Sequence, residues 1–420
     1  MTADRADFAV LGASGMTGRA VLSHLRDRLK GPTKWIIAGR DTSRLEAAAK
    51  TFPDHIRPRV MVIGDLDDAP LDDLCNNVRW LANLAGPYAC HGHRGIDACL
   101  DSGTHYLDLC GEVDVIRQWV DLFHDRATSL GVQVIPAAGF ESLPFDLLTA
   151  SAVARLGTGE TGQAVNIDIL MSYSGLSWAE FPNYASTGTI ATAFETLLRN
   201  PSAEQLLDPL SLSSTYRDAT RASTSRIHLS AWYDDEYRVW RAPLVPGPFT
   251  NPAIVHRSNG LLSETGAGYG SNFAYNENMN VSSIAPWPVG QGMIATAIAT
   301  SSRQFLSALG SDSLQRRSTL ALWKNLSEKP PALIDRDLDR VDYQLDVTAT
   351  RRGSPPVRAR LTGKGHPGYR STGNIVGELL LGLGEAGDNV QSGGVLTPSV
   401  ALGSGWLNRL GPAGLHCHWF

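Results

Sequence analysis

The sequence predicts an α/β fold, in which an N-terminal doubly wound parallel sheet is followed by an inserted α+β region with a largely antiparallel sheet. Three observations carry this prediction. Short apolar runs alternate with helix-like stretches over the first third of the chain, and a glycine-rich loop joins the first run to the first helix. Beyond about residue 148 the predicted strands instead alternate apolar and polar residues, as half-buried strands do.

The first region, residues 1–148, contains six apolar runs that we predict to be strands. They are residues 8–11, 35–38, 60–63, 80–84, 106–109 and 132–136. The predicted helices between them are residues 17–29, 44–51, 93–101 and 113–130. Val21, Leu22 and Leu25 lie on one face of the first helix, and alanines favour the second. Glycines follow the other two, as they commonly follow helix ends.

The second region, residues 149–371, has the pattern of half-buried strands. Residues 165–173 and 341–349 each place an apolar side chain at every second position. Residues 357–361 continue this alternation beyond a Gly-Ser-Pro-Pro turn, which predicts an antiparallel hairpin. Ser371 or Thr372 is placed to cap a last helix that runs to Leu383.

Composition and charge exclude several classes of protein. Hydrophobic residues make up 43% of the 420 residues and charged residues 19%, as in globular proteins and unlike disordered or fibrous chains. The net charge of −5 lacks the basic surplus of a nucleic-acid binder, so we expect no nucleic-acid partner. Five cysteines without a C-x-x-C pair argue against a disulfide framework or a zinc site, and favour reduced thiols in the cytoplasm.

Metal and membrane signals are weak. His91, His93 and His105 lack the i, i+4 spacing of two ligands on one helix face, so no metal is expected. No run approaches the roughly 18 apolar residues that a membrane-spanning helix needs. We therefore predict no transmembrane segment, and contact with a membrane surface stays open.

The strongest local signal is the glycine-rich loop between the first strand and the first helix. Small residues let the backbone approach a pyrophosphate, and the helix N-terminus offers free N–H groups and a partial positive charge. A tight turn without a ligand is the alternative, but the position at the first strand–helix junction favours a dinucleotide. The residues expected to bind it are Gly12, Ala13, Ser14, Gly15, Met16, Thr17 and Gly18.

The end of the second strand favours NADP over NAD. An NAD site has an acidic residue there for the ribose hydroxyls, whereas this chain has Arg40, whose guanidinium can pair with a 2′-phosphate. Asp41 weakens this interpretation, and a solvated arginine is the alternative. Asp65 follows the third strand and is placed to meet the adenine amino group, or to cap a loop. The residues expected on the ribose side, with the same alternative, are Asn83, Ala85, Gly86 and Pro87.

Four segments carry a resemblance to a known family. They are the glycine loop with Ala-Gly-Arg-Asp at 38–41, Asn-Leu-Ala-Gly-Pro-Tyr at 83–88, Gly-Thr-His-Tyr-Leu-Asp-Leu-Cys-Gly-Glu at 103–112 and Ala-Gly-Phe-Glu-Ser-Leu-Pro-Phe-Asp at 138–146. They closely resemble the saccharopine dehydrogenase-like oxidoreductases, and best the subgroup with the trans-acting enoyl reductases of polyketide and lipid assembly. The chain departs from this pattern at Gly365-His366, where an aspartate is expected.

The resemblance implies a domain organisation and a cofactor. It implies an NADP-binding Rossmann domain over residues 1–148, completed by residues 372–420, and a substrate and dimerisation domain over residues 149–371. It also implies NADPH and the reduction of a C=C or C=N bond. A homodimer and a synthase partner are expected by the same analogy.

The catalytic candidates follow the later strands, because open α/β sheets bind ligands at the carboxyl ends of their strands. Tyr88 is the first choice as proton donor, since a phenol can protonate an enolate or an amine and regain the proton from solvent. His91 is a further candidate. Asp108 and Glu112 are also candidates, although fixing loops by accepting backbone N–H bonds is the stronger interpretation of both.

The residues after the sixth strand complete the expected site. Gly139 and Phe140 are expected beside the nicotinamide, and Glu141 is interpreted as a partner of the helix dipole. We therefore predict an NADPH-dependent oxidoreductase that reduces the enoyl C=C bond of a small or carrier-bound apolar precursor in polyketide or lipid-type biosynthesis. An imine or saccharopine-type reductase, a redox-neutral nucleotide-dependent enzyme and a non-catalytic interaction protein stay open as alternatives.

Overall fold

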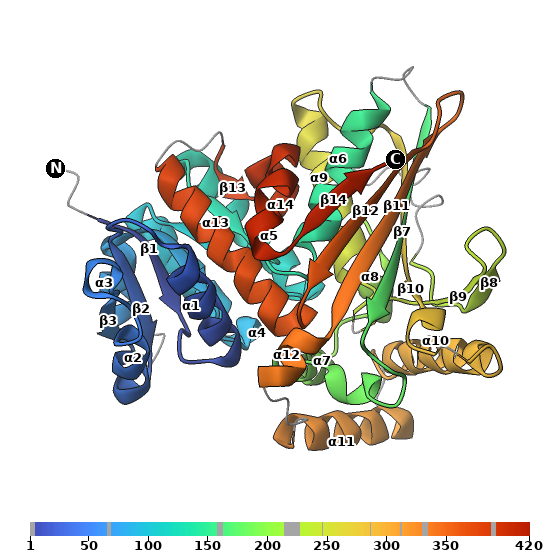
Figure 1. Cartoon of the computed structure of the whole chain (residues 1–420), viewed down its shortest axis with the longest axis horizontal. Coiled ribbons are helices and arrows are strands. Elements are labelled where there is room, and N and C mark those ends of the chain that lie inside the picture. Colours follow the sequence, from blue (N-terminus) through green and yellow to red (C-terminus); the bar gives the residue numbers. More distant parts are fainter. Residues whose placement is uncertain are drawn as a thin grey trace.

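Two seven-stranded sheets form the molecule, with helix α13 (Thr372–Ala386) between them (Figure 1). The computed structural model describes residues 5–64, 69–157, 163–213, 227–245, 247–285, 287–310, 313–329, 335–387 and 392–420. Every pairing in the first sheet is parallel, and the second sheet is mostly antiparallel. The predicted fold class is therefore confirmed.

The first sheet has the strand order β13-β6-β5-β4-β1-β2-β3. Its strands are β1 (Ala6–Leu11), β2 (Trp35–Gly39), β3 (Arg59–Val62), β4 (Val78–Asn83), β5 (His105–Asp108), β6 (Gln133–Ile135) and β13 (Gly394–Val395). The six predicted strands are all present, because parallel strands buried on both faces appear in a sequence as continuous apolar runs. The seventh strand, β13, comes from the C-terminal segment and pairs with β6.

The helices of this region are α1 (Met16–Arg28), α2 (Thr42–Ala49), α3 (Ala69–Asn76), α4 (Tyr88–Ser102), α5 (Val113–Leu130) and α6 (Leu143–Leu156). Helices α1 to α5 connect its parallel strands, and α6 leads from β6 to the second sheet. The helix expected over 93–101 begins five residues earlier, directly after Pro87. Gly92 lies in this added turn because the Trp119 ring of α5 occupies the space that a side chain would need. The sequence did not predict α3, which is short.

The second sheet has the order β14-β12-β11-β7-β10-β9-β8. Its strands are β7 (Ala164–Ser174), β8 (Trp232–Asp234), β9 (Val239–Ala242), β10 (Asn272–Asn280), β11 (Asp342–Arg351), β12 (Val357–Lys364) and β14 (His416–Trp419). The predicted hairpin is the antiparallel pair β11–β12. The pair β7–β10 is parallel, which the long connection between these strands makes possible.

The remaining helices surround the second sheet and return to the first. They are α7 (Thr187–Arg199), α8 (Ala203–Leu207), α9 (Thr250–Glu264), α10 (Gln291–Ser307), α11 (Leu314–Glu328), α12 (Asp335–Arg340), α13 and α14 (Pro398–Leu402). Short helical turns cover Asp54–Ile56, Phe181–Tyr184, Val281–Ser283, Pro367–Ser371 and Ser404–Ala413. Among the described helices, none has the length and apolar character needed to cross a membrane.

The segment 372–420 contributes to both sheets. Helix α13 packs along α1, where His24 Nε2 and Arg28 Nε lie 2.7 Å and 2.6 Å from Glu378 Oε1. Strand β13 extends the first sheet, whereas β14 pairs with β12 in the second. The chain after residue 372 therefore joins the two sheets, and the expected domain boundaries stay a prediction.

We expect Gly373→Ala to destabilise the fold, because α13 approaches α1 most closely there. A Cβ at Gly373 would lie 2.5 Å from the Ala20 Cβ and 2.9 Å from the Ala20 backbone carbon. Overpacking of this kind costs about 1–3 kcal/mol of unfolding free energy, measurable by denaturant titration. Gly384→Ala in the same helix is the control, since its Cβ would come no closer than 3.4 Å to Asp7. Equal stability of the two variants would contradict the expectation.

Candidate active site

A cavity of about 620 Å³ lies where the carboxyl ends of the first-sheet strands face the second sheet. The loops after β1, β4, β5 and β6 form one wall, and β7, α7, the start of α9 and the turn before α13 form the other. The predicted site residues that line it are Gly15, Met16, Thr17, Gly18, Gly86, Pro87, Tyr88, Glu112, Gly139 and Phe140. Those that do not line it are Gly12, Ala13, Ser14, Arg40, Asn83, Ala85, His91 and Asp108.

The glycine loop presents the bare N-terminus of α1 to this cavity. Gly15 is the N-cap and has no side chain to bond the first N–H groups, and the first turn carries no acidic residue. Gly12 has a φ of +82°, and a Cβ at Gly18 would lie 2.6 Å from the Ala13 carbonyl oxygen. The free N–H groups of Met16, Thr17 and Gly18 therefore fit the pyrophosphate of a dinucleotide.

Arg40 lies exposed at the end of β2, next to the glycine loop. A Cβ at the preceding Gly39 would lie 3.7 Å from Ser14 Oγ, so the two segments adjoin. Asp41 is occupied elsewhere, because its side chain accepts the Arg44 backbone N–H at 3.0 Å and caps α2. Its carboxylate also lies 3.2 Å from Arg44 Nε, and Arg40 remains available to a 2′-phosphate. The expected adenine contact, Asp65, lies outside the described residues.

A buried chain of hydrogen bonds fixes the ends of β4 and β5. Asn83 Nδ2 donates to the Tyr106 hydroxyl at 3.1 Å, which donates to Asp108 Oδ2 at 2.8 Å. Asn83 Oδ1 accepts the Ala85 N–H, and Asp108 Oδ1 accepts the Cys110 N–H. Burial raises the pKa of Asp108 to about 7, against these hydrogen bonds. Asn83 and Asp108 thus shape the loops behind the cavity, which agrees with the loop-fixing interpretation.

Tyr88 begins α4 and lines the cavity, but its hydroxyl is engaged. It donates to the Asn83 carbonyl oxygen at 3.1 Å. Burial, followed by the nearby Asp108 charge, raises the pKa of Tyr88 well above its usual value. A proton directed at a backbone oxygen is poorly placed for transfer to a substrate. The role of Tyr88 as proton donor stays a prediction, as does that of His91, which lies on α4 away from the cavity lining.

Glu112 and Asp114, at the start of α5, are paired with one arginine. Arg199, the last residue of α7, places Nη1 2.6 Å from Glu112 Oε2 and Nε 2.9 Å from Asp114 Oδ2. Burial raises the pKa of Glu112, and the Arg199 charge opposes this. The ion pairs hold the end of α7 against the first sheet across the cavity, a contact that no sequence pattern announced.

The loop after β6 is held by the C-terminal segment. The Phe140 N–H donates to Thr372 Oγ1 at 3.2 Å, and this hydroxyl donates to the Pro367 carbonyl at 2.7 Å. A Cβ at Gly139 would lie 2.7 Å from Leu109 Cδ2 and 3.0 Å from Thr372 Cγ2. Glycine at 139 therefore lets α13 begin directly beside this loop, at the edge of the cavity.

His366, which replaces the expected aspartate, is buried in the same wall. Its Nδ1 accepts the Gly368 N–H at 3.0 Å, so Nε2 carries the proton and donates to the Tyr184 carbonyl at 2.8 Å. The imidazole ring of His366 also stacks on the Tyr184 ring, with centroids 4.0 Å apart. Burial lowers the pKa of His366 to about 4. A neutral ring thus lies where the resemblance predicts a carboxylate, and this part of the wall carries no negative charge.

Glu141 is the site residue whose importance the sequence reasoning missed. It lines the cavity at the end of β6, and burial raises its pKa to about 7, with a smaller contribution from the Glu112 charge. Its position after the sixth strand was a signal, but nothing local shows what surrounds the carboxyl group. Behind Glu141, Asn251 Oδ1 accepts a hydrogen bond from the Ser142 hydroxyl at 2.8 Å, and Asn251 Nδ2 donates one to Glu277 Oε2 at 2.9 Å.

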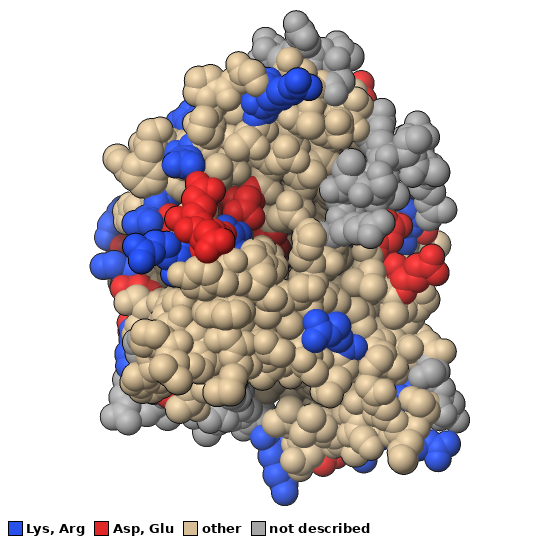
Figure 2. All heavy atoms as spheres, turned by 90° about the vertical axis from the view of Figure 1, so that its right-hand side faces the viewer, with Lys and Arg blue, Asp and Glu red and all other residues tan. Residues whose placement is uncertain are grey.

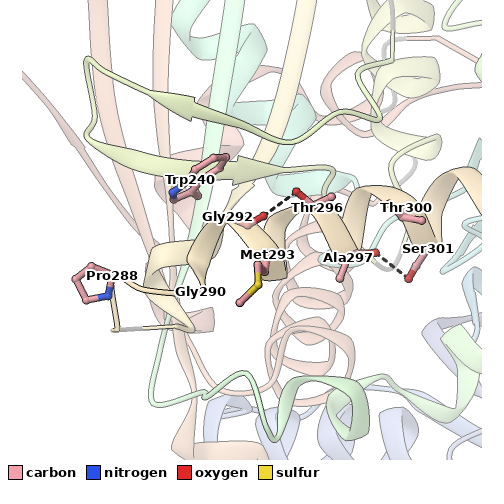
Figure 3. Close-up of a pocket in the computed structure, with 9 residues that line it drawn as sticks. All are labelled: Trp240, Pro288, Gly290, Gly292, Met293, Thr296, Ala297, Thr300 and Ser301. Atoms are coloured by element: carbon pink, nitrogen blue, oxygen red, sulfur yellow. Dashed lines mark hydrogen bonds between the residues drawn. The ribbon is translucent and has the colours of Figure 1, made fainter.

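A second, shallow groove runs along the outer face of α10 and carries no titratable group among the residues that line it. Figure 3 shows Trp240 of β9 at one end, beside Gly292 and Met293, with Thr296 and Ala297 along the helix. On the face that Figure 2 shows, acidic and basic side chains gather to the left of the centre, and much of the remaining described surface carries no charged group. The groove is separate from the cavity that holds the predicted cofactor-binding residues, and we assign the chemistry to the cavity.

Comparison with known proteins identifies the class. Residues 8–135 match the family model of the saccharopine dehydrogenase NADP binding domain. A protein of Mycobacterium tuberculosis named among the trans-acting enoyl reductases is 29% identical over 97% of this chain and 96% of its own length. A trans-acting enoyl reductase of Mycobacterium ulcerans is 27% identical over the same shares. The solved structure of apo saccharopine dehydrogenase from Saccharomyces cerevisiae aligns with 98% of this chain and 99% of its own, at 12% identity and a TM-score of 0.49.

The domain match and the two mycobacterial relatives confirm the resemblance that the sequence motifs carry. The chain is an NADP-dependent oxidoreductase that is similar to the saccharopine dehydrogenase NADP-binding domain and to trans-acting enoyl reductases. The assignment of individual residues to the cofactor rests on the geometry described above and stays a prediction.

We expect Arg40→Ala to weaken NADPH binding selectively, because it removes the cation beside the 2′-phosphate. The variant should lose about 1.5–3 kcal/mol of NADPH binding free energy, which raises the Kd roughly tenfold or more. Titration by nicotinamide fluorescence measures it, with NADH as the matched ligand. Lys50→Ala, which removes an exposed charge at the far end of α2, should bind both nucleotides normally. An equal loss of NADPH and NADH affinity in Arg40→Ala would contradict the assignment.

Glu277 gives the stability of the protein a specific pH dependence. Its Oε2 accepts from Tyr275 and Asn251, its Oε1 has no partner among the described residues, and burial raises its pKa from 4.5 to about 8. The stabilisation from a group of this kind is complete below the unfolded pKa and is lost as the pH rises through the folded pKa. The unfolding free energy should therefore fall between pH 4.5 and about 8.

Glu277→Gln should make that fall shallower, because the amide does not ionise, while buried carboxyls such as Asp108 keep part of it. Denaturant titrations across the pH range measure the slope. Glu385→Gln, on the exposed side of α13, is the control and should keep the slope of the unaltered protein. The assignment fails if Glu277→Gln keeps that slope as well.

Proposed function

We propose that the protein is an NADPH-dependent enoyl reductase, which reduces the C=C bond of an apolar α,β-unsaturated thioester in polyketide or lipid-type assembly. The names of its relatives from two mycobacteria support this reaction. The cavity adds independent support, because its lining beyond the glycine loop is largely apolar. The apolar residues that line it include Phe140, Phe145, Met171, Tyr173, Leu206, Leu244, Phe249 and Phe305.

One observation carries the choice of substrate class. Among the described residues, the cavity lining contains no lysine or arginine, but it contains Glu112, Asp114 and Glu141. Arg199 lies behind this lining and is already paired with two carboxylates. A dicarboxylate amino acid such as a saccharopine-type substrate would bury its carboxylates against a described lining that offers them no lysine or arginine. A neutral acyl thioester meets no such penalty.

The residues of the chain then have distinct roles. The first turn of α1 holds the pyrophosphate through backbone N–H groups, and Arg40 binds the 2′-phosphate. NADPH, when bound, supplies the hydride. Gly139 and Phe140 form the floor beside the nicotinamide, and α7 covers the opposite side with small residues that leave room for an acyl chain. The residues of α7 that line the cavity are Thr187, Gly188, Thr189, Ala191, Thr192, Ala193 and Thr196.

We expect the purified protein to oxidise NADPH with a neutral α,β-unsaturated acyl thioester. The same thioester with a carboxylate at the far end of its chain should be a markedly poorer substrate, because the lining offers that charge no cation. For each of the two thioesters, the absorbance of the nicotinamide measures NADPH oxidation, and mass spectrometry identifies the reduced product. Turnover of an imine of an amino acid, without turnover of any enoyl thioester, would favour the saccharopine-type alternative instead.

A further inference from the structure

The carboxyl group of Glu141 lies in a slot between two glycines from distant parts of the chain. A Cβ at Gly111, after β5, would lie 2.7 Å from Glu141 Oε2. A Cβ at Gly247, before α9, would lie 3.2 Å from Glu141 Oε1. A Cβ at Gly111 would displace the carboxyl group and a Cβ at Gly247 would crowd it, so the two glycines leave room for the carboxyl group in this slot.

The slot opens on the cavity. Gly111, Glu141 and Gly247 all line it, together with Thr250, whose hydroxyl donates to the Gly111 carbonyl at 2.7 Å. Glu141 keeps a partly exposed side chain there, whereas Glu112 is almost fully buried. The side chain of Glu141 is therefore part of the wall that a substrate in the cavity would meet.

Glu141 differs from the other two carboxylates of the lining in its partners. Glu112 and Asp114 are both paired with Arg199 of α7. No ion pair joins Glu141 to a basic group in the described part of the chain, and the charged groups that act on it are acidic. Glu112 lies on the side of α5, and Glu277 of β10 lies behind the wall that Asn251 forms.

This environment favours the neutral acid. Burial is the main cause that raises the pKa of Glu141 to about 7, the neighbouring Thr250 hydroxyl opposes the rise, and the Glu112 charge adds to it. A substantial fraction of Glu141 is therefore protonated at neutral pH. Tyr88, by contrast, points its only proton at the Asn83 carbonyl.

We propose that Glu141 is the proton donor of the reduction, acting from the slot between Gly111 and Gly247. This inference rests on the proposed function and names the acid within the same site. The β-carbon of the enoyl thioester receives a hydride from NADPH, and the π-electron pair moves toward the α-carbon. The O–H bond of Glu141 breaks, a C–H bond forms at the α-carbon, and the carboxylate regains its proton from solvent.

The test compares Glu141→Gln with the unaltered protein in single turnovers at saturating NADPH and enoyl thioester. Loss of a general acid should slow the step on the order of 100-fold or more. The rate of the unaltered protein should fall as the pH rises through about 7, since the neutral acid is the active form. Glu141→Gln should lose this fall, and Glu141→Asp should restore part of the rate and of the pH dependence.

Two readouts do not depend on turnover. NADPH should bind Glu141→Gln as tightly as the unaltered protein by nicotinamide fluorescence, which also shows that the variant folds. Infrared spectra of the unaltered protein should contain a protonated carboxyl band that titrates near neutral pH and is absent from Glu141→Gln. Glu264→Gln, at the exposed end of α9, is the matched control and should change none of these properties.

The outcomes separate the two proposals. Failure of the unaltered protein to reduce any enoyl thioester overturns the proposed function, and the infrared titration still decides whether Glu141 holds a proton at neutral pH. Enoyl reduction that Glu141→Gln performs at the full rate overturns the role of Glu141 and leaves the function intact. A rate of the unaltered protein that is flat across neutral pH overturns that role even if the variant does not fold.

Discussion

Helix α1 packs closely against the glycine loop before it and against α13 beside it, and the rest of the site depends on these two contacts. At its start, glycine at position 18 lets the helix lie against the Ala13 carbonyl, and two residues further Ala20 touches Gly373 of α13. The helix is thereby fixed in position, and its uncapped N-terminus faces the cavity where an anion can use it. The same contact fixes the start of α13, so Thr372 can hold the loop that carries Phe140. Cofactor site and substrate wall thus depend on one helix pair.

The acidic residues around the cavity have two different roles. Asp108 and Glu112 hold the surrounding loops and helices in place, whereas Glu141 lies in the cavity wall. Asp108 accepts hydrogen bonds behind the strands, and Glu112 joins Arg199 in an ion pair that anchors α7. Both are buried, and each has partners that account for its position. Glu141 alone combines a place in the cavity wall with the absence of a cationic partner among the described residues. Burial without a counter-charge is the usual way in which a protein keeps a carboxylic acid neutral near pH 7.

Much of the first sheet could be predicted, because each of its strands is a short apolar run that a helix-like stretch separates from the next. Strand β13 could not, since two residues are too few for any pattern, and nothing local announces that β10 lies parallel to β7. The glycine loop could be predicted from its spacing together with its position between the first strand and the first helix. The setting of Glu141 was not, because its slot depends on Gly111 and Gly247, which approach it only in the folded chain. The engagement of the Tyr88 hydroxyl was equally hidden, since its acceptor is a backbone oxygen.

The central claim is that the cavity combines a cofactor-derived hydride with a proton from an acid that exchanges with solvent. Reduction of an enoyl thioester with unlabelled NADPH in deuterated water tests it most directly, with the position of deuterium in the product read by NMR. The account predicts deuterium at the α-carbon and only protium from the cofactor at the β-carbon. Deuterium at the β-carbon, or product formed without oxidation of NADPH, would contradict it.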